Sequence, residues 1–248
     1  MPPFTFNSDR WLIPDWPAPA NIRAGTTLRG GGVSLPPYDS LNLGEHVGDN
    51  PAAVAENRRR LNLPTEPIWL RQTHSTQIVD AARCTSGQTK ADGSYTTEPQ
   101  VICTVLSADC LPILICDRAG TTVAAVHAGW RGLAAGIIEQ AIATLPVHGK
   151  DLLAWLGPAI GPDAYEVGNE IRATFIAHDP AANTAFNAAQ EKWRMDIYQL
   201  ARQRLMALGI TAIYGGNRCT FTEKQHFYSY RRDGLTGRMA SLIWLEQR

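Results

Sequence analysis

The chain has 248 residues, of which 44% are hydrophobic and 19% are charged, the composition of a globular protein that can bury a large core. Its 23 basic and 23 acidic residues balance, which argues against extended binding of a nucleic acid backbone but leaves room for a small pocket of arginines that binds one phosphate. No apolar run approaches the roughly 18 residues that cross a bilayer, so we expect no membrane segment.

The cysteines are five in number, an odd count, and include no CxxC pair. This pattern favours reduced thiols over a disulfide framework. The first residues, MPPFTFNSDRWLIPDW, lack the charged-then-apolar order of a signal peptide. We therefore expect a cytoplasmic protein.

The first part of the chain predicts short strands and loops over residues 1–40, followed by a helix. Asn50-Pro51 supplies a favoured N-cap and first helical position, and this helix should stop before Pro64. Residues 67–81 are rich in strand formers on both sides of a polar centre, which puts His74 on or beside a strand. The 16 residues 85–100 are rich in turn formers and predict a long, flexible surface loop of the kind that serves as a lid.

The rest of the chain alternates apolar strands with amphipathic helices. We expect a hairpin of residues 111–117 and 121–127, helices at 130–145, 167–178 and 195–209, and strands at 152–157, 211–215 and 238–247. Gly209 is the expected C-cap of the third of these helices. No repeat or linker divides the sequence, so we predict one mixed α/β domain over residues 1–248, with mixed sheets flanked by helices.

The hairpin places two reactive side chains together. A turn centred between Arg118 and Ala119 pairs residues whose numbers sum to 237, and Cys110 and His127 satisfy this sum. Directly opposed residues have Cβ atoms roughly 4.5–5.5 Å apart, close enough to share a metal ion or exchange a proton. A bulge at Thr121 or Thr122 would shift this register by one residue.

Five motifs occur in order between about Ser40 and the end of the chain: RQTHSTQIV, SADCLP, VHAGWRG, LGPAIGPDAYEVG and YSYRRDGLTGR. Together they resemble the bacterial polyphenol-oxidase or laccase-domain family, also called peptidoglycan editing factor. The resemblance implies a zinc-dependent purine nucleoside phosphorylase that acts on adenosine or inosine with phosphate, with adenosine deaminase side activity. It also implies a fold like that of a bacterial toxin deamidase, and we expect a monomer or homodimer.

The resemblance further implies that zinc is held by His74, Cys110 and His127. Three protein ligands leave a fourth position for water or substrate, as in catalytic zinc sites. Copper is the less favoured alternative, because the six histidines include no HxH cluster of the kind that multicopper oxidases use. The HxE and PCxxC motifs of the familiar zinc deaminases are also missing.

Other residues near these motifs are candidates for catalysis and substrate binding. Asp109 could orient His127, carry a proton or cap the strand end. Arg131 lies near a predicted helix N-terminus, where a guanidinium suits phosphate, although it could instead pair with a carboxylate. Further substrate-binding candidates are Arg71, Gln72, Asp92, Ser229 and Arg231, with Asp92 expected in the loop that closes over the site.

Two other functions are compatible with the same residues. In an amide hydrolase that edits peptidoglycan precursors, Cys110 would be the nucleophile and His127 its base. In a partner-binding module the zinc would be structural, but three ligands rather than four weigh against this reading.

Overall fold

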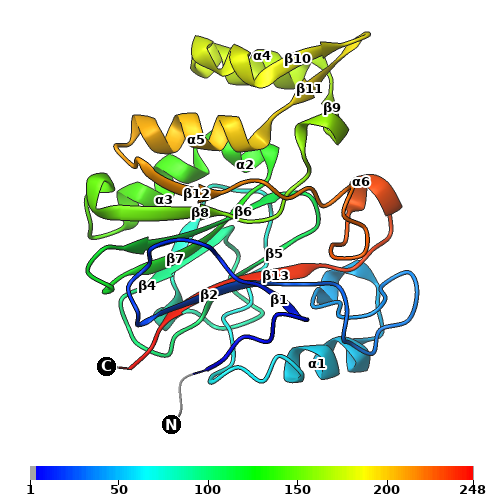
Figure 1. Ribbon diagram of the computed structural model, residues 1–248, viewed down its shortest axis with the longest axis vertical. Helices are drawn as coiled ribbons and strands as arrows, with labels where there is room; N and C mark the ends of the chain where they lie inside the picture. Colours follow the sequence, from blue (N-terminus) through cyan, green and yellow to red (C-terminus); the bar gives the residue numbers. More distant parts are fainter. Residues whose placement is uncertain (1–3, 248) are drawn as a thin grey trace.

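The computed structural model describes residues 4–247 and has a layered core (Figure 1). The central layer is a mixed six-stranded sheet in the order β12 (Ala212–Gly215), β8 (Leu152–Leu156), β6 (Leu111–Asp117), β7 (Val123–Ala128), β4 (Gly93–Thr96) and β3 (Ile78–Asp80). An antiparallel four-stranded sheet packs on one face, in the order β1 (Trp11–Leu12), β2 (Ile22–Thr27), β13 (Met239–Leu245) and β5 (Cys103–Ser107). The expected mixed α/β fold is confirmed.

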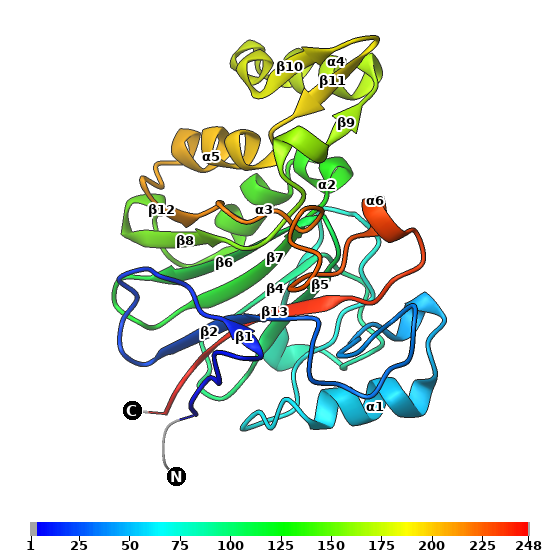
Figure 2. The same cartoon turned by 45° about the vertical axis from the view of Figure 1, so that its right-hand side comes forward.

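Strand β6 is buried on both faces, which explains why its sequence is apolar up to Asp117. Ile113 and Ile115 pack under the helices, whereas Leu114 and Cys116 pack against the four-stranded sheet. The covering helices are α2 (Trp130–Ala135), α3 (Ile137–Thr144) and α5 (Ile197–Ala207), as Figures 1 and 2 show. Helix α1 (Pro51–Arg59) lies below the four-stranded sheet, and the Asn50 side chain caps it as predicted.

A smaller unit stands at one end of the molecule, above the helical layer in Figure 2. It comprises α4 (Asn169–His178) and the sheet of β9 (Glu166–Val167), β11 (Lys192–Met195) and β10 (Phe186–Ala189). The sequence analysis predicted α4 but not this sheet, whose strands are short and largely exposed. The short helix α6 (Tyr230–Asp233) lies near the start of β13.

Two predicted elements were wrong in detail. The single helix over residues 130–145 is divided at Gly136, which adopts φ 98° and ends α2 before α3 begins. The predicted loop over residues 85–100 contains the buried strand β4, so much of it is core rather than lid. None of the helices within residues 4–247 has the length and apolar character needed to cross a membrane.

Candidate metal centre

The β6–β7 hairpin has a different register from the one predicted. Pro112, not Cys110, is opposite His127, so paired residues sum to 239. The Asp117 side chain causes this shift, because it accepts hydrogen bonds from the backbone N–H groups of Thr121 and Thr122 and from the Thr121 hydroxyl, stabilising a longer turn. A shift of two residues keeps each side chain on its original face, and Cys110 therefore still meets His127.

His74, Cys110 and His127 form a compact group whose ligand atoms all lie within 4.8 Å of one another. The Cys110 Sγ atom is 3.7 Å from Nε2 of His74, and the two imidazole rings have centroids 4.9 Å apart. His74 arrives from a loop, where it adopts φ 59°, a conformation that is uncommon outside glycine. This group could hold a metal ion.

Asp92 holds two of these residues in place. Its fully buried carboxylate accepts a 2.9 Å hydrogen bond from Nδ1 of His127 and another from the backbone N–H of His74. It also accepts hydrogen bonds from the backbone N–H groups of Thr73 and Ser75 and from the Ser75 hydroxyl. Asp92 therefore lies behind the centre at the start of β4, and its expected place in a mobile loop was wrong.

The charges within this group favour a thiolate. Burial alone would raise the pKa of the Cys110 thiol, but the charges and hydrogen bonds of His127 and His74 outweigh it and lower that pKa to about 6. Burial opposes protonation of His127, yet the Cys110 thiolate and the hydrogen bond to Asp92 raise the pKa of its imidazole to about 9. The thiolate, the form of cysteine that binds metals, is thus available at neutral pH.

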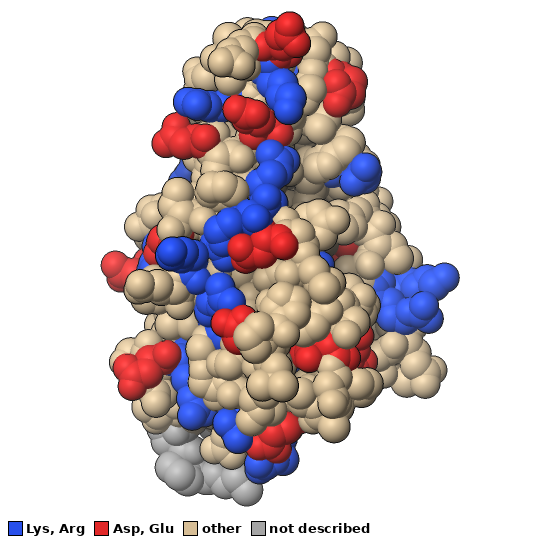
Figure 3. All heavy atoms as spheres, turned by 90° about the vertical axis from the view of Figure 1, so that its right-hand side faces the viewer, with Lys and Arg blue, Asp and Glu red and all other residues tan. Residues whose placement is uncertain are grey.

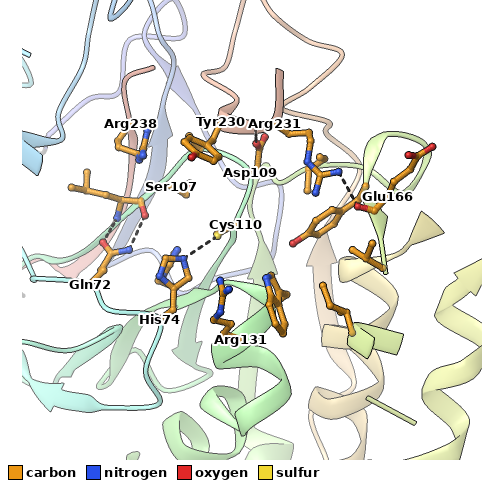
Figure 4. Close-up of a pocket in the computed structure, with 18 of the residues that line it drawn as sticks. Gln72, His74, Ser107, Asp109, Cys110, Arg131, Glu166, Tyr230, Arg231 and Arg238 are labelled. Carbon is orange, nitrogen blue, oxygen red and sulfur yellow. Dashed lines mark hydrogen bonds between the residues drawn. The ribbon is translucent and has the colours of Figure 1, made fainter. Parts of the chain in front are cut away.

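A pocket of about 620 Å³ opens over the three residues (Figure 4). Figure 4 shows Cys110 near its middle, with Arg238 and Arg231 on opposite sides above it and Arg131 below it. The apolar and aromatic lining is Leu106, Trp130, Ile160, Tyr165, Val167, Ile171 and Tyr230. Figure 3 shows the face that carries α6, where basic side chains run in a line down the surface.

Besides the three candidate ligands, four residues predicted for catalysis or substrate binding line this pocket: Gln72, Asp109, Arg131 and Arg231. The Gln72 side-chain amide both donates to and accepts from the backbone of Leu106, at 2.8 and 2.7 Å. The Asp109 carboxylate accepts hydrogen bonds from the Thr220 hydroxyl and the backbone N–H of Arg231, each at 2.6 Å. Asp92, not Asp109, is therefore the carboxylate that orients His127.

The two predicted arginines of the pocket have aromatic partners. Arg131 lies 4.5 Å from the ring centroid of Trp130, and Arg231 lies 5.2 Å from that of Tyr165. Arg231 also donates from Nη1 to the carbonyl of Glu166. Within residues 4–247, neither guanidinium forms an ion pair with a carboxylate.

Three predicted substrate-binding residues lie outside the pocket lining: Asp92, which lies behind the metal centre, Arg71 and Ser229. Arg71 is exposed, and its backbone N–H donates to the Thr89 carbonyl. Ser229 is fully buried, and its hydroxyl caps α6 by accepting from the backbone N–H of Arg232. Helix capping accounts for Ser229 without a substrate.

Several lining residues were missed by the sequence analysis, notably His46, Tyr165, Tyr230 and Arg238. His46 has no partner at motif spacing in the sequence. Arg238, however, ends the YSYRRDGLTGR motif, and Tyr165 belongs to LGPAIGPDAYEVG. Those motifs were the signal that could have found both.

Comparison with known proteins places the chain in a family. The family described as multi-copper polyphenol oxidoreductase laccase matches residues 23–246, and this protein belongs to it. A relative from Shigella flexneri, named purine nucleoside phosphorylase YfiH, is 54% identical over 94% of this chain and 98% of its own length. A purine nucleoside phosphorylase from Pseudomonas aeruginosa is 55% identical over 95% of this chain and 98% of its own.

A crystal structure from Neisseria meningitidis matches the whole fold. It has a TM-score of 0.92 and 50% sequence identity, and covers 96% of this chain and 100% of its own. The family description names copper, but among the described residues one group of three or more metal-ligating side chains occurs, His74, Cys110 and His127. This part of the chain therefore offers no ligands for a multicopper cluster.

Proposed function

We propose that this protein is a zinc-dependent purine nucleoside phosphorylase that converts inosine or adenosine and phosphate into a purine base and ribose 1-phosphate. The observation that carries the proposal is the His74–Cys110–His127 group beneath a pocket with three arginines that lack carboxylate partners among residues 4–247. The names of relatives above 50% identity over nearly the whole chain support it.

The donor set fits zinc. One thiolate and two imidazoles match the ligands that zinc prefers, and three ligands leave a position open, as in catalytic sites. The hydrogen bond from Nδ1 of His127 to Asp92 leaves Nε2 as the metal-binding nitrogen of the neutral ring. A zinc ion held here would supply a positive charge that polarises an oxygen of the bound phosphate or substrate.

The pocket residues would bind and orient both substrates. In phosphorolysis the bond between C1′ and N9 breaks, a bond between C1′ and a phosphate oxygen forms, and the base leaves with a proton. Arg131, Arg231 and Arg238 give the pocket the positive charge that an anionic substrate requires, and Trp130 and Tyr165 offer aromatic surface for the purine. A volume of about 620 Å³ is within the usual range for small-molecule sites.

We assign Asp109 the role of positioning Cys110 and Arg231. Both of its carboxylate oxygens are already hydrogen-bonded: Oδ1 joins the Cys110 loop to Thr220, and Oδ2 joins it to the backbone of Arg231 in α6. Asp109 adopts φ 96°, so these hydrogen bonds hold a strained backbone next to Cys110. Loss of this carboxylate should move both Cys110 and Arg231.

Steady-state kinetics with inosine test the proposal. The rate should saturate with phosphate, fall on treatment with a chelator and return with zinc more fully than with copper. A rate independent of phosphate would contradict phosphorolysis, and a rate unchanged after verified metal removal would contradict zinc dependence. Adenosine should also react, with slow release of ammonia as a deaminase side activity.

A second function, amide hydrolysis, is favoured by one observation. The Cys110 thiol with its lowered pKa, the His127 imidazole and the Asp92 carboxylate occur in the order nucleophile, base and orienting group. A cysteine hydrolase built this way would act on an amide of a peptidoglycan precursor without metal or phosphate. Activity of the metal-free protein on such an amide, lost in Cys110→Ser, would favour this function.

We also propose a cytoplasmic location, because the odd number of cysteines and the missing CxxC pair favour reduced thiols.

A further inference from the structure

Arg238 is a pocket residue that the sequence analysis did not select. It directly precedes β13, and its Nη1 atom donates to the carbonyls of Thr236 and Gly237, at 2.9 and 3.0 Å. Its backbone N–H donates to the Asn42 side chain. These bonds fix the side chain in the pocket wall, where Figure 4 shows it on the opposite side of the pocket from Arg231, with Arg131 below Cys110.

The Arg238 guanidinium is half-buried and lacks a direct counterion. Within the described residues no carboxylate pairs with it, whereas Arg58, the other arginine whose charge acts on His46, pairs with Glu45 at 2.7 Å. Burial lowers the pKa of Arg238, and the charges of Cys110 and Asp109 offset this only from a distance. Because taking a cation out of water without a partner costs free energy, this wall favours an anionic ligand group.

The opposite wall is built differently. Arg131 and Arg231 are exposed at the rim, and each lies over an aromatic ring, Trp130 or Tyr165. Ile171 and Val167 continue this wall with apolar surface. Flat aromatic and apolar surface suits a purine better than a phosphate dianion.

We propose that Arg238 and His46 form the phosphate subsite of this pocket, and that the wall of Trp130 and Tyr165 takes the purine. This assignment rests on the proposed phosphorylase function and orients its substrates. Phosphate and base lie on opposite sides of Cys110, so the ribose C1′ atom is held between them. The His46 ring supplies a hydrogen bond, while Arg238 supplies the charge.

The lining residues also explain why His46 acts without charge. Burial and the charges of Arg238, Arg58 and His127 lower the pKa of its imidazole, which favours the neutral ring. A neutral ring can donate one N–H to a phosphate oxygen without adding to the repulsion from Arg238.

The test measures binding of inorganic phosphate to the zinc-loaded protein by calorimetry, for the unaltered chain, Arg238→Gln and Arg131→Gln. Loss of a charge-assisted hydrogen bond should weaken phosphate binding about tenfold or more in Arg238→Gln. Arg238→Lys, which keeps the charge, should restore part of the loss. In Arg131→Gln the affinity for phosphate should change less than about twofold, since this residue lies on the purine wall.

Kinetics separate the assignment from the function. Arg238→Gln should raise the KM for phosphate and leave that for inosine nearly unchanged, while Arg131→Gln should do the reverse. If Arg131→Gln loses phosphate binding and a folded Arg238→Gln does not, the assignment is overturned although the phosphorylase function stands. If the unaltered protein turns over inosine without phosphate, both are overturned.

Discussion

The Asp92 carboxylate accepts a 2.9 Å hydrogen bond from Nδ1 of His127 while it also holds the backbone of the segment that carries His74. One buried acid therefore positions two candidate metal ligands, His74 and His127, that are 53 residues apart in the sequence. Carboxylates behind metal-binding histidines fix the ring orientation and increase the basicity of the ligand.

Asp92→Asn should weaken zinc binding by about 10–100-fold, because the amide cannot accept all the hydrogen bonds that the carboxylate accepts. Competition with a chelating dye measures the affinity. Asp117→Asn is the matched control: Asp117 is also buried and accepts from Thr121 and Thr122, but far from the centre. Asp117→Asn should lower thermal stability and leave the affinity for zinc unchanged. Equal affinities in the two variants would show that Asp92 does not support the metal.

Cys110→Ser should lose most of the bound metal, because an alcohol is a much poorer zinc ligand than a thiolate. Cys103→Ser should keep it, since Cys103 is buried in β5 within the core between the sheets. Metal analysis of the two purified variants gives the answer. Full zinc occupancy in Cys110→Ser, with loss in Cys103→Ser, would mean that the ligands are assigned wrongly.

Zinc should protect Cys110 from alkylation. In the metal-free protein the lowered pKa of about 6 makes the thiol largely thiolate at pH 7, and its reaction with iodoacetamide should slow as the pH falls through that value. Peptide mass spectrometry with and without zinc would locate the label. Equal labelling of Cys110 in both samples would favour the nucleophilic cysteine of the amide hydrolase over a metal ligand.

Arg71→Gln should leave the kinetic constants for inosine and phosphate within about twofold, since exposed charges away from a site contribute little. The side chain is exposed and does not line the pocket. Arg231→Gln, which alters the rim next to Tyr165, should by comparison raise the KM for inosine. A large loss of activity in Arg71→Gln would show that the pocket extends to this residue.

Most of the fold could be predicted because its signals are local. The Asn50 cap, the helix that ends near Gly209 and the apolar strand β6 each depend on a few adjacent residues. The division of a helix at Gly136 and the burial of β4 depend on tertiary packing. The turn-forming residues around β4 therefore led to the wrong prediction of a loop there.

The site shows a similar limit. The predicted register of the hairpin was wrong, yet the predicted proximity of Cys110 and His127 was right. A shift of two residues leaves each side chain on the same face of its strand. The Asp117 side chain set the longer turn, and a count of residues could not reveal it. His46 and Arg238 reach the same pocket from segments 192 residues apart, an arrangement that no local pattern encodes.

The fate of the ribose distinguishes phosphorolysis from hydrolysis. Inosine would be turned over by the zinc-loaded protein in ¹⁸O-labelled water containing unlabelled phosphate, and the sugar product identified by mass spectrometry. Phosphorolysis predicts ribose 1-phosphate without ¹⁸O, because the new bond at C1′ is made by a phosphate oxygen. Free ribose carrying ¹⁸O would contradict the account, because water would then be the attacking group.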